Sequence, residues 1–412
     1  MINPVLFVGL ILATVLTYSC LAQTKMSHKE RRADRHLERH SYYKASELYK
    51  KVVGKNPRNE RAKLKLARTY FQANKPVEAE LYYSEVIHKK YLVKSLDYLH
   101  YAQVLQSAEK FTNAKKWGRK YLAINSRNTI AQNLIYSLEN VSNYYKDSSR
   151  YIVESLNINT DASEFSPSFF QKGIVFVSSR SKKHSIKRNY SRDKSKYLNL
   201  YYSEGLIGNE MMTRPEKIKG QVNTRFHQGP ATFYQDNQKI IYTSNSTSSS
   251  QDNTLKLYSA SFSTVKNRWE NVIPLPINKE KYSYGHPSMD MDGKVLYFAS
   301  NMPGGVGGTD LYKVKFDGEN WGTPINLGPE INTPGKEMFP YIDSNNQLYF
   351  SSNGHGGLGG LDIYFVNLNN SIHMVQNMGF PINSTRDDFG LIYDEHKTLG
   401  YFSSDRSGQS DL

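Results

Sequence analysis

Two kinds of hydrophobic spacing divide the chain. In the C-terminal part, short runs such as Phe339–Ile342 and Gln347–Phe350 are rich in aromatic and β-branched residues, and a polar turn separates them. This pattern predicts a β-hairpin. A glycine-rich tract at 356–360 permits positive backbone dihedral angles, residues 362–366 predict a third strand, and a fourth is expected near 374–378.

The four-strand pattern recurs along residues 151–412. Each copy follows an Ile-Asn or Val-Asn dipeptide, and these begin at Ile158, Val222, Ile277, Ile331 and Ile382. Repeated sets of four short strands predict an all-β propeller, whose ring protects the strand edges. We expect five recognisable blade repeats, the last one truncated, with residues 151–156 adding a strand to the last blade.

The N-terminal part has helical spacing instead. Ala45, Ala79 and Ala114 recur 34 and 35 residues apart, as do Tyr49 and Tyr83 at 34. This is the tetratricopeptide period, in which small residues mark the contact between paired helices. The sequence therefore predicts an α+β multidomain chain with an all-α helical repeat at 27–149, and its helices are expected at 28–39, 42–54, 60–73, 77–89, 94–108, 111–124 and 127–145.

The first residues are typical of a signal peptide at 1–22. Val5–Leu16 is apolar and too short to span a bilayer comfortably, and small residues follow it. Cleavage after Ala22 is one expectation. The other is lipidation of Cys20, which is the only cysteine, although Thr17 stands where such a motif usually has Leu. Either route predicts an exported protein.

Composition adds a strong basic balance. The 412 residues carry a formal net charge of +15, which favours polyanions or anionic surfaces and does not bear on the fold. The longest basic tract lies in the first blade repeat and is a candidate loop for an anionic partner, with a solvated loop as the alternative. Its members are Arg180, Lys182, Lys183, Lys187, Arg188, Arg192, Lys194 and Lys196.

Motifs for chemistry are not evident. The glycine tracts at 304–308 and 356–360 lack the Lys-Ser/Thr of a phosphate loop and open no helix. Asp310, Asp362 and Asp411 follow such tracts and could bind calcium, or could cap turns as Asx residues do. We therefore assign no catalytic, cofactor-binding or metal residues and expect no cofactor, and we expect that the chain is not an enzyme.

The repeat motifs resemble a known family. Residues 287–300, with Gly293-Lys-Val-Leu-Tyr-Phe298, and the motif Gly356-Gly-Leu-Gly-Gly-Leu-Asp-Ile-Tyr364 look like the TolB-type, WD40-like propeller repeat. Helical repeats followed by such a propeller resemble the front half of OmpA-family envelope proteins of the Bacteroidota, including PorE-like components of type IX secretion.

That resemblance implies a noncatalytic scaffold in the periplasm, associated with the outer membrane. Its expected partners are envelope or secretion-machinery proteins, with no nucleic acid and with membrane contact only through an N-terminal lipid anchor or through partners. The alternatives are a propeller that binds a glycan or peptide and, further behind, a propeller hydrolase. The peptidoglycan-binding domain of the relatives has no counterpart in these residues.

Overall fold

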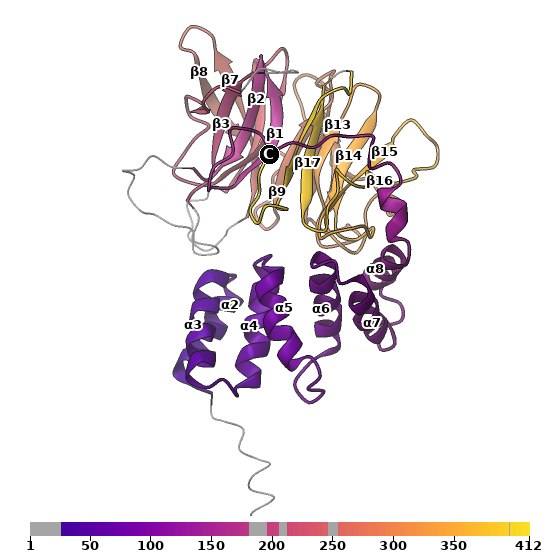
Figure 1. The fold of residues 1–412 in the computed structure, drawn as a ribbon. Coiled ribbons are helices and arrows are strands. Elements are labelled where there is room, and N and C mark those ends of the chain that lie inside the picture. The colour runs from indigo at the N-terminus through magenta and orange to yellow at the C-terminus, as the bar shows by residue number, and fades with distance from the viewer. Residues whose placement is uncertain (1–25, 181–195, 206–211, 246–253, 395) are drawn as a thin grey trace, which may run out of the picture.

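The computed structural model describes residues 26–180, 196–205, 212–245, 254–394 and 396–412. A row of helices precedes a ring of small β-sheets along the chain, and the row lies beside one face of the ring (Figure 1). The predicted order of a helical repeat followed by a β-propeller-like part is therefore confirmed.

The described helical part contains seven α-helices that agree closely with the predicted ranges. Asn59 and Asn128 cap two of them by accepting from the backbone N–H three residues on, and Pro76 opens another. The helices are α2 (His28–Glu38), α3 (Tyr42–Lys55), α4 (Glu60–Gln72), α5 (Pro76–Val86), α6 (Ser95–Ser107), α7 (Phe111–Leu122) and α8 (Thr129–Glu139), followed by the 3₁₀ turn η1 (Val141–Tyr145).

Helix packing explains the alanine spacing. Consecutive helices pack against each other, and α6 also contacts α4 and α8. Ala45, Ala79 and Ala114, on α3, α5 and α7, are completely buried, as are Tyr49 and Tyr83. Small side chains at these positions let helix axes approach closely, so the repeat period records core contacts.

In each sheet of the propeller-like part, the antiparallel strands lie side by side in the order in which they occur in the sequence. The first sheet holds β1 (Glu164–Phe170), β2 (Gly173–Ser178), β3 (Asn199–Glu204) and β4 (Glu216–Lys217), and the second holds β5 (Gln228–Tyr234), β6 (Lys239–Ser244), β7 (Lys256–Ser263) and β8 (Arg268–Pro274). The third holds β9 (Tyr284–Met289), β10 (Val295–Ser300), β11 (Asp310–Lys315) and β12 (Ile325–Asn326), and the fourth holds β13 (Glu337–Ile342), β14 (Gln347–Ser352), β15 (Asp362–Asn367) and β16 (Gln376–Asn377).

The number of blades differs from the expectation. The described residues form four complete four-stranded blades, not five, because the last repeat forms only β17 (Asp388–Tyr393) and β18 (Gly400–Ser404). Residues 151–156, which were expected to add a strand there, form no ladder. Asp411 forms an isolated bridge with Ser404, and the N–H of Leu156 donates to the carbonyl oxygen of Leu412.

The ring nevertheless closes. The first strands of adjacent sheets contact one another, including β17 with β1, and core clusters lie between neighbouring sheets. The cluster that joins the last sheet to the first contains Ile174 and Phe176 with Ile392 and Tyr401. Four complete blades and one two-stranded sheet thus surround a common axis.

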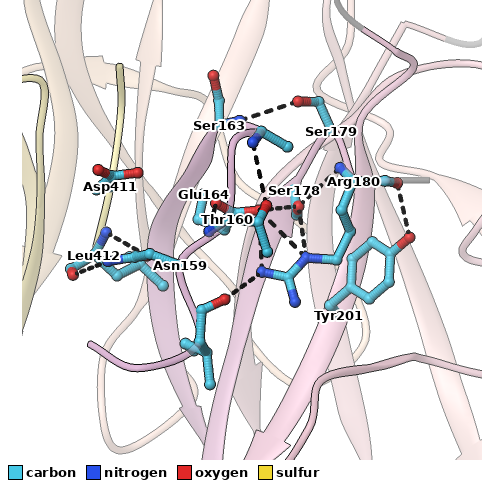
Figure 2. Close-up of polar contacts among 12 residues, drawn as sticks. Asn159, Thr160, Ser163, Glu164, Ser178, Ser179, Arg180, Tyr201, Asp411 and Leu412 are labelled. Carbon is cyan, nitrogen blue, oxygen red and sulfur yellow. Dashed lines mark hydrogen bonds and ion pairs between the residues drawn. The ribbon is translucent and has the colours of Figure 1, made fainter. Parts of the chain in front are cut away.

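The Ile-Asn markers have a shared structural role. In each repeat the Asn side chain accepts from the N–H, and donates to the C=O, of the second residue in a third strand. Asn159 makes the same pair with Leu412, at 3.0 and 2.7 Å, and so ties the start of the ring to its end (Figure 2). The residue pairs of this Asn clasp are Asn159 with Leu412, Asn223 with Leu200, Asn278 with Leu257, Asn332 with Leu311 and Asn383 with Ile363.

Candidate interaction site at the junction of helices and propeller

An ion-pair ladder joins the helices on one side of the stack. Arg61 of α4 pairs with Glu30 of α2 at 3.0 Å, and Arg68 binds both oxygens of Asp97 on α6 at 2.6 Å. Asp97 is almost fully buried and also accepts from the backbone N–H of Lys94. A two-pronged arginine–carboxylate pair fixes orientation as well as distance, so the ladder sets the spacing of the alternate helices α2, α4 and α6.

The stack docks on the glycine tract of the fourth blade. Gln106 of α6 donates to the carbonyl oxygen of Gly357 at 2.8 Å, and Asn133 of α8 donates to that of Gly354 at 2.7 Å. Gly356 has a φ of +82°, and a Cβ there would lie 2.6 Å from Oγ of Ser137 and 2.8 Å from the carbonyl oxygen of Asn133. The sequence analysis attributed this glycine to the turn between two strands. Its closeness to α8 is a second reason why a residue without a Cβ is needed here.

A second contact uses two carboxylates. Asn74, which follows α4, donates its amide to Asp387 at 2.8 Å and to Asp405 at 2.7 Å. Burial and, after it, the charge of Asp405 raise the pKa of Asp387 to about 7. Burial also raises the pKa of Asp405. One amide thus bridges a pair of carboxyl groups that hold a proton more readily than exposed ones.

A third contact follows α8. The carbonyl oxygen of Tyr144 accepts from the N–H of Phe380 at 2.7 Å, and the ring of Tyr145 lies 5.0 Å from that of Phe380. The three contacts involve the end of α4, the helices α6 and α8, and η1, so they spread along the stack. Such a distributed junction holds the helices and the propeller in one orientation.

Acidic residues at the start of the inner strands are part of the propeller's own framework. Glu164 accepts from Thr160 and Ser178, and it pairs with Arg180 at 3.0 Å (Figure 2). Arg180 also donates to the carbonyl oxygen of Ile158, and its side chain is only 15% exposed. Equivalent positions hold Gln228 with Thr224, Glu337 with Thr333 and Asp388 with Ser384.

Of the basic tract, the structure describes only Arg180 and Lys196; Lys182, Lys183, Lys187, Arg188, Arg192 and Lys194 lie outside the described residues, as does Cys20. Since the guanidinium group of Arg180 is engaged by Glu164, we assign it to holding the start of this loop in place. The binding role of the tract stays a prediction.

Glu337 differs from its counterparts because no cation pairs with it in the described chain. Burial raises the pKa of Glu337 to about 7. Burial also raises the pKa of Asp388, but Arg406, at 2.8 Å, opposes that rise. The folded chain therefore binds more protons than the unfolded chain between pH 4.5 and 7, and the stability that Glu337 contributes falls as the pH rises through this window.

Replacing Glu337 by Gln should remove this loss, since Gln228 fills the same position in the second blade. We expect the free energy of unfolding at pH 8 to rise by about 1 to 3 kcal/mol, with little change at pH 5. Urea unfolding at both pH values measures it. Glu164→Gln is the contrasting control, because it leaves Arg180 without its carboxylate and should destabilise. Equal losses in both variants at pH 8 would contradict the assignment.

The aspartates after the glycine tracts cap turns. Asp310 accepts from the N–H of Gly307 at 2.9 Å and from Asn326 at 2.8 Å, and Asp362 accepts from the N–H of Gly359. These contacts use the oxygens that calcium would need, so they favour the turn-cap alternative. No group of three or more His, Cys, Asp or Glu side chains suited to a metal occurs among the described residues.

The axial channel is a cavity of about 300 Å³. His286 lies in its wall, stacked at 3.9 Å on Phe339, and its Nδ1 accepts from the N–H of that residue. Burial lowers the pKa of His286 to about 4, so its ring is neutral at physiological pH. Asp290, at the channel mouth, accepts from two backbone N–H groups of its own turn. Asp236 is the other acidic residue in the described lining of this cavity.

A larger cavity of about 1100 Å³ lies at the incomplete blade. Its wall includes Tyr151, Tyr349, Phe365 and Tyr393, and it runs along the outer side of β18. Aromatic walls of this kind can hold sugars or extended peptides. The sequence did not predict this cavity, because it depends on which strands of the last repeat are present.

No helix in the described ranges has the length and apolar character to cross a membrane. A tetratricopeptide repeat model matches residues 36–91, from the end of α2 to just beyond α5. A search of curated proteins finds no match. Together with the fold, the match establishes tetratricopeptide-type repeats followed by a propeller-like domain.

Several solved structures are similar at low identity. A thermostable family-43 glycoside hydrolase is 14% identical with a TM-score of 0.39, over 61% of this chain and 87% of that chain. An endo-arabinase from Bacteroides thetaiotaomicron is 11% identical with a TM-score of 0.41, over 63% and 95%. An α-L-arabinofuranosidase from Lactobacillus brevis is 10% identical with a TM-score of 0.36, over 62% and 86%. At these values the likeness carries no argument about activity.

Proposed function

We propose that this protein is a noncatalytic scaffold that binds protein partners through its helical stack while the propeller fixes the stack's orientation. The observation that carries the proposal is the distributed junction, in which Asn74, Gln106 and Asn133 all donate to the propeller. A junction spread over the stack holds the stack rigidly, which suits a surface that binds protein partners. Tetratricopeptide-type stacks generally serve to bind proteins.

The partners that we propose are envelope or secretion-machinery proteins, met after export and at the outer membrane. This part rests on the apolar run Val5–Leu16 and on the resemblance to OmpA-family and PorE-like proteins. The second candidate is a propeller that binds a glycan or peptide. It is favoured by one observation, the aromatic wall of the 1100 Å³ cavity.

In-cell cross-linking of the tagged full chain, with mass spectrometry of what it captures, tests the proposal. Leu81 on α5 is apolar and 58% exposed, and Val265 of the propeller is 95% exposed. Leu81→Glu should reduce the capture of envelope proteins, whereas Val265→Glu, the matched control, should not. Recovery of a sugar or peptide with no protein partner would replace the scaffold with the second candidate.

A further inference from the structure

The first described helix, α2, has one face made almost entirely of basic residues. At about 100° per residue, the exposed side chains of its helical wheel fall in a single arc along all three turns. Glu38, the one acidic residue that is exposed, lies at the edge of this arc. The basic residues that define this α2 face are Lys29, Arg31, Arg32, Arg35 and Arg39, all exposed.

The other two acidic residues of the same helix, Glu30 and Asp34, point the other way. Glu30 is buried and pairs with Arg61 of α4, and Asp34 pairs with Lys65 at 3.0 Å and accepts from Tyr49. Within the described chain, none of the five cations of the α2 face has an ion-pair partner. The helix therefore uses its acids for the fold and leaves its cations to solvent.

The positive charges of the α2 face affect the pKa of a neighbouring side chain, His36. Burial lowers the pKa of His36, and the charges of Lys44, Arg32, Arg39 and Arg35 lower it further. Several cations thus act on one point of the surface. An array of arginines over a helix of 11 residues, about 16 Å long, suits several phosphate groups at once.

We propose that the α2 face binds the phosphate headgroups of an anionic lipid surface. This goes beyond the proposed scaffold function, which needs no membrane contact of its own. α2 and α3 lie at the end of the stack opposite α8 (Figure 1), and the basic side chains of α2 are exposed there. Four to eight Lys or Arg on one helix face are enough for electrostatic binding to anionic lipid.

The position of α2 in the sequence favours lipid over a soluble polyanion. His28 follows Cys20, the candidate lipidation site, by only 8 residues, a reach of at most about 30 Å. A basic surface so near an acylated Cys20 gives the two weak signals that membrane attachment usually combines. The α2 face itself lacks exposed large apolar side chains, so its own contribution is electrostatic and salt-sensitive.

Vesicle flotation of the full chain tests this proposal. Wild type, Arg32→Gln/Arg35→Gln and the control Lys90→Gln/Lys116→Gln are compared on vesicles of phosphatidylcholine alone and of phosphatidylcholine with phosphatidylglycerol. Lys90 and Lys116 are exposed and lie in the same stack. Their substitution removes the same two positive charges as the α2 variant. All three proteins have the same N-terminus, so the neutral vesicles measure its contribution.

We expect wild type and control to prefer the anionic vesicles, and the α2 variant to lose about thirtyfold in affinity for them, at roughly fivefold per charge. Raising the salt should remove the preference. Equal binding of all three proteins to anionic vesicles would overturn the proposal. So would equally tight binding of wild type to soluble polyglutamate, which would assign the face to an acidic protein instead. Circular dichroism of each variant checks that α2 remains folded.

Discussion

Replacing Asn383 by Ala is expected to lower the free energy of unfolding of the propeller by about 3 to 5 kcal/mol. The Asn383 side chain is completely buried, accepts from the N–H of Ile363 at 2.7 Å and donates to its carbonyl oxygen at 2.9 Å. It also donates to Asn377. Truncation leaves buried N–H and C=O groups without partners, each costing about 1 to 3 kcal/mol.

Urea unfolding followed by the fluorescence of Trp269, which is buried in the second blade, measures this loss. Asn345→Ala is the control, because Asn345 is exposed in a turn of the neighbouring hairpin. It should change stability by less than about 0.5 kcal/mol. If the two variants unfold alike, the Asn clasp does not stabilise the blades in the way described.

Gly356→Ala should loosen the junction between stack and propeller, whereas Gly304→Ala should not. The two glycines occupy the same place in their tracts and have similar φ values, +82° and +90°. A Cβ on Gly356 would meet α8, while one on Gly304 would meet nothing within 4 Å. Both alanine variants therefore lose the same stability from the left-handed backbone. The additional loss of stability in Gly356→Ala, about 1 to 3 kcal/mol, measures the clash with α8.

Hydrogen exchange along α8 (Thr129–Glu139) measures this difference. The Gly356→Ala variant should exchange faster there, with α3 and α4 unchanged, because Asn133 loses its acceptor on Gly354. Gly304→Ala should exchange like wild type. Faster exchange in α8 of both variants would show that backbone strain, rather than the junction, is responsible.

Local patterns predicted most of the fold. The helices were predicted because buried alanines and tyrosines recur at the repeat period, and the strands because aromatic and β-branched runs alternate with turn residues. The number of blades was not predictable in this way. Whether a repeat forms four strands depends on neighbours distant in sequence, as Leu156 and Leu412 illustrate by sharing a single hydrogen bond.

Most of the candidate site could not be predicted from the sequence. Asn74 and Asp405 are 331 positions apart, and nothing in either segment signals the contact. Arg180 was grouped with the basic tract by charge alone, whereas its partner Glu164 is specified by the pairing of β1 with β2. The Ile-Asn dipeptides could be recognised in the sequence as markers of the repeat. Their hydrogen bonds to the third strands could be seen only in the folded ring.

The account depends on one fixed orientation of the helical stack on the propeller. Spin labels at Lys90→Cys in the stack and Lys172→Cys in the propeller, both exposed positions, in a Cys20→Ser background, allow the distance between the two parts to be measured by pulsed dipolar spectroscopy. A single narrow distance distribution that broadens in Gly356→Ala but not in Gly304→Ala is the predicted result. A broad distribution in the otherwise unchanged chain would contradict it, because the two parts would then move independently.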